Sequence, residues 1–397
     1  MYEQARHEWL IEAQWDKERV LATIDQIVRD TCSRFDPQKL WPIHPLDVFR
    51  NGLTEPLKML YFGAAGVIWA LDYLNKIGAT PVKEDFSMAL NELASKNRNE
   101  MALSERETAS YWMGDVGILL VHWRLFPSPA LDDAIYRAVE ANVNNPTREF
   151  MWGAPGTMLA ALFMYEFTED ERWKEAYLQS VRQLVGDLER NNEYGCYVWT
   201  QELYGRSSTY LGAGHGLAAN VFSIAKGRDF IDRQIFSLVT SRTTDTLVRT
   251  AKIDQVYANW PAGLGGTKYL VQHCHGAPGM INCLADLPHG VSDSLDRLLI
   301  QGGELTWKAG PLVKGSNLCH GTAGNGYAFL KLYQRTRNPM WLDRARAFAM
   351  HAIEQSERHA KDYGQRRYSL WTGDLGLAVY LWDCMQGQAQ FPTMDVF

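Results

Sequence analysis

Two cysteines and one histidine are the residues of this sequence whose types and positions most clearly indicate a chemical site. Cys274 stands just before a glycine pair in HCHGAPG, and Cys319 and His320 stand just before another in LCHGTAG. Two thiolates and one imidazole are three of the four ligands of tetrahedral zinc, and an open fourth position is typical of a catalytic site. The cysteines lie too far apart for a zinc finger, which pairs them as C-x-x-C. We interpret the three residues as one metal site.

Buried structural cysteines are the alternative, because free cysteine is a common core residue. We favour that alternative for the remaining four, which are Cys32, Cys196, Cys283 and Cys384. Six dispersed cysteines in 397 residues are too few for a disulfide scaffold.

A histidine and a glutamate occupy similar places in other repeats. His215 lies in GAGHGL, and Glu149 precedes the glycine pair of MWGAPG. A histidine that titrates near neutral pH is a natural proton donor or acceptor. A lone histidine is more often a core residue, but its place in a repeat beside the metal repeats favours a catalytic role.

The repeat itself is two glycines followed at once by an apolar helical segment. Its seven copies carry the pairs Gly63/Gly66, Gly114/Gly117, Gly153/Gly156, Gly212/Gly216, Gly276/Gly279, Gly321/Gly324 and Gly373/Gly376. The fourth copy is irregular by one residue. Segments between the copies are amphipathic, as in residues 171–190, where Trp173, Tyr177 and Val181 recur at helical spacing.

Buried helices alternating with amphipathic ones predict an all-α fold, an α/α toroid with seven inner and seven outer helices. We expect a single domain over 1–397, in which 1–50 form an N-terminal helical segment and 51–397 form seven helical-hairpin repeats. The glycines would serve close backbone packing and turns, and the inner helices would begin at a central cavity.

Composition excludes several functional classes. The net charge is −6 without blocks of like charge, which does not suggest a nucleic-acid-binding surface. No apolar run reaches the roughly 18 residues of a membrane span, and the first residues are too charged for a secretory signal. We expect a cytoplasmic protein, with peripheral membrane association left open.

At these motifs the sequence resembles the lanthionine synthetase C-like family. HCHGAPG with LCHGTAGNGYAFL is similar to the family's zinc-binding pair, GAGHGL to its histidine motif and NWPAG to the loop before the first cysteine. YSLWTGDLG and QFPTMDVF resemble the stand-alone eukaryotic-type members more than the lanthipeptide cyclases. The resemblance implies one zinc ion on Cys274, Cys319 and His320, with a water that a substrate thiol replaces.

The implied reaction is addition of a thiol to dehydroalanine or dehydrobutyrine in a peptide or protein, which forms a thioether. In the stand-alone members the implied thiol is glutathione. His215 would protonate the α-carbon, and Glu149 would orient His215. The implied glutathione contacts are Lys314 and either Arg366 or Arg367, while His275 would touch substrate or simply form a hydrogen bond. His273 departs from the family's usual aromatic residue and would be a competing ligand or a hydrogen-bond partner.

Two alternatives stay open at this point. The first is a lanthipeptide cyclase, which joins a cysteine to a dehydroamino acid of the same peptide with the same metal and acid. The second is a signalling scaffold that binds zinc and glutathione without turnover.

Overall fold

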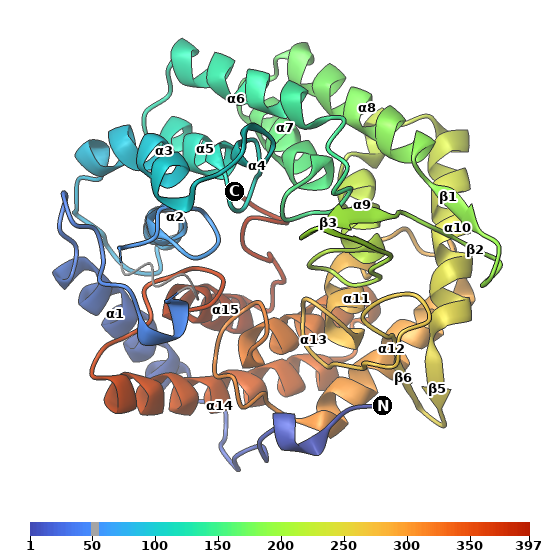
Figure 1. The fold of residues 1–397 in the computed structure, drawn as a ribbon. Helices are drawn as coiled ribbons and strands as arrows, with labels where there is room; N and C mark the ends of the chain where they lie inside the picture. The colour runs from blue at the N-terminus through green and yellow to red at the C-terminus, as the bar shows by residue number, and fades with distance from the viewer. Residues whose placement is uncertain (49–54) are drawn as a thin grey trace.

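The computed structural model describes residues 1–48 and 55–397, and its helices form two concentric rings (Figure 1). In these residues the inner ring consists of α2 (Ala64–Lys76), α5 (Asp115–Leu125), α7 (Ala154–Thr168), α9 (Leu217–Lys226), α11 (Ala277–Leu284), α13 (Thr322–Thr336) and α15 (Asp374–Gln386). The outer ring consists of α1 (Lys17–Ser33), α3 (Ser87–Met101), α6 (Pro129–Asn142), α8 (Glu171–Gly186), α10 (Arg233–Thr250), α12 (Asp293–Ala309) and α14 (Pro339–Tyr363). This arrangement confirms the predicted α/α toroid.

Short elements connect the helices on one side of the rings. They are α4 (Glu105–Thr108) and three antiparallel hairpins, β1 (Glu189–Asn191) with β2 (Cys196–Val198), β3 (Gln201–Leu203) with β4 (Arg206–Ser208), and β5 (Lys252–Asp254) with β6 (Tyr257–Asn259). Short 3-10 helices span Gln4–Arg6, Pro45–Asp47 and Arg228–Phe230. No helix in the described ranges combines the length and apolarity that crossing a membrane requires.

The rings close through contacts between distant parts of the chain. Inner helix α15 packs against α2, and outer helix α1 packs against α15 and α14. The N-terminal segment therefore contributes an outer helix to the ring, because only residues 387–397 follow α15. The proposed division of the chain at residue 50 into a segment and seven repeats remains a prediction.

Each inner helix begins directly after a glycine, so the seven N-caps are Gly63, Gly114, Gly153, Gly216, Gly276, Gly321 and Gly373. In the irregular fourth copy the N-cap is Gly216, and Ala219 takes the place of the second glycine. That assignment corrects the Gly212/Gly216 pairing. It also puts His215, His275 and His320 at one equivalent position, immediately before an N-cap.

Backbone hydrogen bonds join the residues that lie two positions before the N-caps. The N–H groups donate to the next carbonyl along the ring, from Gly214 to Cys274 (3.2 Å), Cys274 to Cys319 (3.2 Å), Cys319 to Trp371 (3.0 Å), Trp371 to Tyr61 (3.2 Å) and Tyr61 to Trp112 (3.1 Å). Residues far apart in sequence thus meet around the axis at the end where the inner helices begin. This ring of loops positions the site.

Gly276 is the N-cap whose backbone only glycine adopts easily. Its φ is +106°, and a Cβ there would lie 1.8 Å from the carbonyl oxygen of Leu270. We expect Gly276→Ala to lower the free energy of unfolding by about 3 kcal/mol or more, since left-handed strain of about 1–3 kcal/mol adds to the clash. Urea denaturation measures the loss. Gly78→Ala is the matched control, with φ of +75° and no atom within 4 Å, and equal losses in the two variants would contradict the expectation.

Candidate functional site

The structure brings the three predicted metal ligands together. The sulfur atoms of Cys274 and Cys319 and a ring nitrogen of His320 all lie within 4.8 Å of one another. Ligand atoms around tetrahedral zinc, at about 2.0–2.3 Å from the ion, are a little under 4 Å apart. Small side-chain movements would close that difference, and the two sulfurs and one imidazole suit zinc. The donor set therefore fits the predicted ion.

The two thiols are coupled electrostatically. A hydrogen bond from Cys319 lowers the pKa of Cys274, and the same bond raises the pKa of Cys319. The Cys274 sulfur therefore loses its proton more readily than the Cys319 sulfur. A metal cation would favour the deprotonated form of both, because thiolates are the metal ligands.

Each sulfur also has a side-chain hydrogen-bond partner that sequence analysis missed. The Nε2 amide of Gln272 donates to Sγ of Cys274 at 2.8 Å, and the hydroxyl of Tyr61 hydrogen-bonds Cys319. Partners of this kind orient metal ligands and adjust their charge. Tyr61 stands two residues before Gly63, the position that Cys274 and Cys319 hold in their repeats, so the repeat register could have indicated it.

His215 and Glu149 form a second pair beside the thiols. Nδ1 of His215 lies 2.7 Å from Oε2 of Glu149, which is 0% exposed. The backbone N–H groups of Met151 and Trp152 also donate to the Glu149 carboxylate, at 2.9 and 2.7 Å. The carboxylate is thus oriented by three donors, and within residues 1–48 and 55–397 Nε2 of His215 makes no hydrogen bond. The structure joins the two residues as the sequence predicted.

The environment of His215 favours its protonated form. Burial disfavours the imidazolium, but the charge and hydrogen bond of Glu149, together with the charge of Cys274, outweigh burial and raise the pKa of His215. A group with a raised pKa stays protonated to higher pH. The histidine is therefore suited to act as an acid near neutral pH.

Glu149→Gln should weaken this acid without removing it. Loss of the carboxylate charge lowers the pKa of His215, so the alkaline limb of the pH–rate profile should move to lower pH. We expect a rate loss that grows as pH rises and stays smaller than the loss caused by replacing His215. Comparison of pH–rate profiles measures it, with exposed Glu202→Gln as the control. An unmoved alkaline limb would show that Glu149 does not set this pKa.

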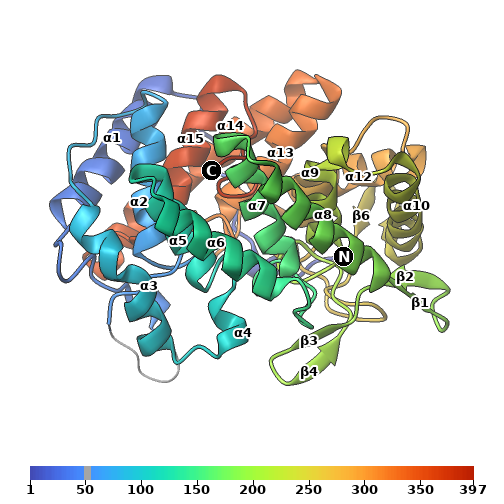
Figure 2. The same ribbon diagram turned by 90° about the horizontal axis from the view of Figure 1, so that it is seen from above.

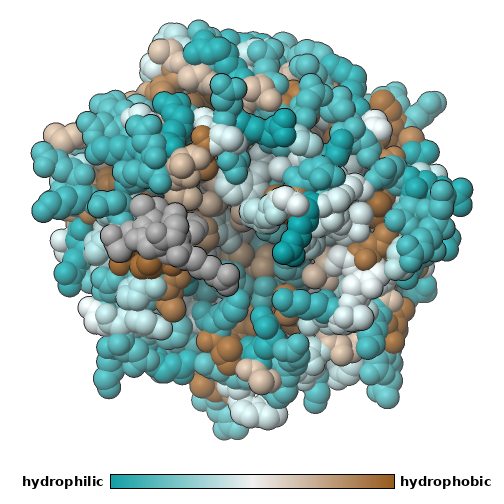
Figure 3. Space-filling view, in the orientation of Figure 1, coloured by the Kyte–Doolittle hydropathy of each residue, from teal (hydrophilic) through white to brown (hydrophobic). Residues whose placement is uncertain are grey.

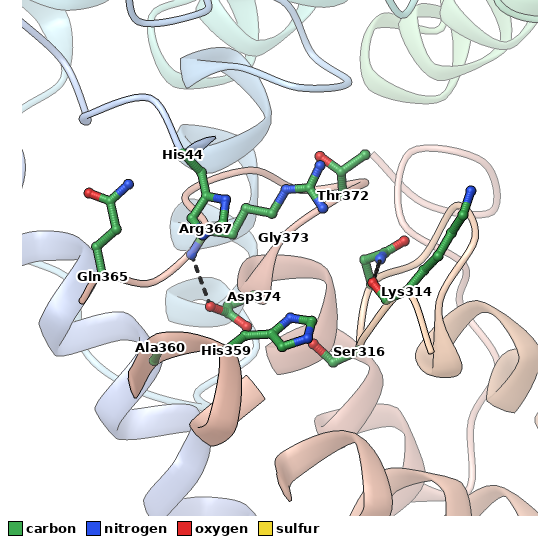
Figure 4. Close-up of a pocket in the computed structure, with 11 residues that line it drawn as sticks. His44, Lys314, Ser316, His359, Ala360, Gln365, Arg367, Thr372, Gly373 and Asp374 are labelled. Carbon is green, nitrogen blue, oxygen red and sulfur yellow. Dashed lines mark hydrogen bonds between the residues drawn. The ribbon is translucent and has the colours of Figure 1, made fainter. Parts of the chain in front are cut away.

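Lys314 and Arg367 line one polar pocket (Figure 4). Asn317 also lines it, and its Oδ1 accepts a hydrogen bond from the backbone N–H of His320 at 3.1 Å. Arg367 is held by Asp47, to which its Nε donates at 2.8 Å and its Nη2 also donates. In the part of the chain that the structure describes, Lys314 makes no ion pair. The pocket thus combines a free cation with an oriented one.

Arg366 does not belong to this pocket. Its side chain is 6% exposed and donates to the Ser356 hydroxyl at 2.9 Å, with Asp374 3.9 Å away. Through these contacts the Arg366 side chain lies between α14 and α15. Of the two arginines that the resemblance offered as substrate contacts, Arg367 lines the pocket beside Lys314 and Arg366 does not, and a substrate contact for either residue stays a prediction.

The two histidines that flank Cys274, His273 and His275, differ in burial. His275 is half-buried, and its ring centroid lies 6.4 Å from that of His215 and 5.7 Å from that of Tyr210. His273 is buried, stacks on Phe391 at 4.6 Å and receives a hydrogen bond from Asn282. Burial lowers the pKa of His273 to about 4. His273 is thus a neutral core residue and a hydrogen-bond partner, outside the ligand cluster.

The C-terminal tail supports the floor of the site from inside the ring (Figure 1). Phe391 stacks on His273 and lies 5.3 Å from Trp371, measured between ring centroids. Nε1 of Trp371 donates to the Thr393 hydroxyl at 3.1 Å. Trp371 belongs to the same hydrogen-bonded ring as the two cysteines, so the tail braces the ligand loops.

Fold and site together define an α/α toroid with a Cys-Cys-His cluster and a histidine–glutamate pair where its inner helices begin. Residues 57–396 match the model of the lanthionine synthetase C-like protein family, and the chain belongs to this family. This membership confirms the resemblance found in the sequence.

The relatives agree with that assignment. The chain is 29% identical over 382 residues to a Danio rerio protein named glutathione S-transferase LANCL1, covering 88% of this chain and 89% of that protein. It is 39% identical over 146 residues to the LanC-like protein GCL1 of Arabidopsis thaliana, covering 35% and 33%. Nisin cyclase shares the fold, with a TM-score of 0.60, 15% identity and 94% coverage of both chains.

Proposed function

We propose that this protein is a zinc enzyme that adds glutathione to dehydroalanine or dehydrobutyrine residues of peptides or proteins. The observation that carries the proposal is the adjacency of two chemical groups. The Cys274–Cys319–His320 cluster lies beside the His215–Glu149 pair, since the loop of His215 is hydrogen-bonded to Cys274 through Gly214. A nucleophile and a proton donor could therefore act on one electrophile.

Cys274, Cys319 and His320 would hold the ion. When bound, zinc would supply a cation that keeps a thiol deprotonated near neutral pH. The glutathione sulfur forms a bond to the β-carbon, and the carbon–carbon π pair moves onto the adjacent carbonyl as an enolate. His215 donates a proton to the α-carbon, and the proton lost by the thiol restores His215. Glu149 keeps the imidazole oriented and charged.

The pocket of Lys314 and Arg367 suits the carboxylates of glutathione. Carboxylates bind well to lysine and arginine, and the pocket adjoins the loop of His320. The printed name of the Danio rerio relative supports glutathione as the thiol. A glutathione-dependent reaction would suit the cytoplasm, where glutathione keeps thiols reduced.

Lys314→Ala should weaken glutathione binding more than catalysis. Lys314 makes no ion pair within residues 1–48 and 55–397, and removal of its charge should raise KM for glutathione by about tenfold, the effect of about 1.4 kcal/mol, with kcat changed much less. Steady-state rates at varied glutathione concentrations give KM and kcat separately. Lys308→Ala removes an exposed lysine of α12 and should leave KM unchanged. An unaltered KM in Lys314→Ala would remove this residue from the site.

Mass spectrometry tests the proposed reaction. A cysteine-free peptide with one dehydroalanine is incubated with glutathione and zinc-loaded protein, beside Cys319→Ala and enzyme-free controls. We expect one added glutathione mass, formed faster with intact protein than in either control. Equal rates in all three samples would contradict the proposal.

A second peptide distinguishes the lanthipeptide cyclase. This peptide carries both dehydroalanine and cysteine, and cyclisation would leave its mass unchanged while removing its reaction with iodoacetamide. The cations beside the metal ligands favour a separate anionic thiol, so we expect the glutathione adduct instead. Stoichiometric zinc and bound glutathione without either product would indicate the non-catalytic scaffold.

A further inference from the structure

The tip of the β3–β4 hairpin carries a residue that is poorly suited to its backbone conformation. Tyr204 and Gly205 form the two-residue loop between Leu203 and Arg206, with φ of +53° and +71°. Two positive φ values are typical of a type I′ turn, whose first position prefers Asn, Asp or Gly. A left-handed conformation is unfavourable for a residue with a Cβ. Turn formation therefore does not explain a tyrosine here.

The side chain of Tyr204 lies at the acid pair. It is 66% exposed, and its ring meets the ring of His215 edge to face at 5.9 Å between centroids. Its hydroxyl accepts a hydrogen bond from Nε1 of Trp152 at 3.1 Å. Trp152 also donates its backbone N–H to Glu149, so one loop positions both Tyr204 and the acid pair.

Within the described residues, the Tyr204 hydroxyl donates only to a weak acceptor. Its oxygen lies 3.9 Å from Sδ of Met151, and a thioether is a poor acceptor. A peptide carbonyl in the same place would be a stronger acceptor. Tyr204 therefore presents an aromatic face and an available O–H donor next to the proton donor of the site.

The hairpin lies on the side of the toroid where substrate must enter. Figure 2 shows β3–β4 and α4 projecting from the same side of the double ring, and these elements directly precede α9 and α5. The inner helices thus begin on this side, as the metal ligands require. The face in Figure 3 is hollowed near its centre, so the hairpin stands at the edge of an accessible depression.

We propose that Tyr204 is a substrate-binding residue that contacts the peptide chain flanking the dehydroamino acid. The inference rests on the proposed function, in which the α-carbon lies within reach of His215. Consecutive Cα atoms are 3.8 Å apart, so a neighbouring peptide residue passes over the ring of Tyr204. Glutathione would lie at Lys314 and Arg367, away from Tyr204. The enzyme would then prefer a dehydroamino acid within a peptide to a free one.

Binding of a peptide without any thiol tests this contact. The probe is a fluorescein-labelled nonapeptide with central dehydroalanine, titrated with zinc-loaded protein and followed by fluorescence anisotropy. Tyr204→Asn keeps a residue that the turn favours and removes the ring, and we expect it to raise Kd by about tenfold or more. Tyr204→Phe removes only the hydroxyl and should raise Kd by about fivefold.

Tyr194→Asn is the matched control, because Tyr194 is a 43% exposed tyrosine of the β1–β2 hairpin and makes no ring contact with His215. It should bind the probe like the unaltered protein. A Kd for Tyr204→Asn within about twofold of that of the unaltered protein would overturn the inference, as would an absence of peptide binding. Peptide binding without glutathione addition would instead refute the proposed function alone.

Discussion

Cys319→Ala is expected to lose bound zinc and thioether formation together. One of the three predicted ligands disappears, and the Cys274 sulfur also loses the hydrogen bond from Cys319 that lowers its pKa. Structural zinc sites with four protein ligands bind with about 10–16 kcal/mol, which is roughly 3–4 kcal/mol per ligand, so loss of one ligand here should weaken affinity by about two to three orders of magnitude. Zinc content after dialysis against a chelator, measured beside turnover, gives both results.

Cys32→Ala is the control for this experiment, because Cys32 lies in outer helix α1 and is half-buried away from the ligand cluster. It should keep one zinc ion per chain and full activity. Stoichiometric zinc in Cys319→Ala would contradict the ligand set, and turnover without zinc would contradict the role of the metal.

His215→Asn should separate the metal from the proton transfer. The ligand cluster is untouched, so zinc content should stay at one ion per chain. Removal of a general acid typically costs about 10²- to 10⁴-fold in rate, and we expect kcat to fall in this range. Glu149 keeps the N–H donors of Met151 and Trp152, so the fold should tolerate the change.

Steady-state kinetics and metal analysis on the same preparation measure both effects. Exposed His289→Asn serves as the control and should match the unaltered protein. An unchanged kcat in His215→Asn would mean that another group, or water, protonates the α-carbon. Joint loss of zinc and activity would mean that His215 acts structurally.

The toroid and the Cys274–Cys319–His320 cluster were predictable for the same physical reason. A glycine before every inner helix repeats along the chain because the loops approach one another closely. Cys274 and Cys319 hold the same place before their glycines, and the backbone hydrogen bond between them reflects that equivalence. The repeat register therefore located the site without homologous structures.

Where the glycine repeat is irregular, the sequence did not determine which glycine begins the inner helix. The fourth copy has glycines at 212, 214 and 216, and sequence alone could not show that Gly216 is the N-cap. The sequence placed His215 at a similar point of its repeat, and the structure fixed its position beside an N-cap, as for His275 and His320. Similarly, either Arg366 or Arg367 fitted the sequence, and only the structure showed that Arg367 lines the pocket with Lys314 whereas Arg366 donates to Ser356.

Sequence periodicity could not predict contacts between distant helices or very short strands. Helix α1 precedes α2 in the chain but packs against α14 and α15, which no local pattern indicates. The strands of the β3–β4 hairpin span three residues each, too few for an alternating pattern to be recognised. Tyr204 was missed for this reason, although its ring lies beside His215.

The configuration of the product tests the central claim most directly. A bound thiol and a fixed His215 would deliver the proton to one face of the α-carbon, whereas uncatalysed addition allows both faces. Acid hydrolysis converts the adduct of glutathione and dehydroalanine to lanthionine, whose diastereomers separate by chiral gas chromatography. We predict one predominant diastereomer with zinc-loaded protein and a mixture without it. The same mixture in both samples would contradict protonation by His215 in a structured site.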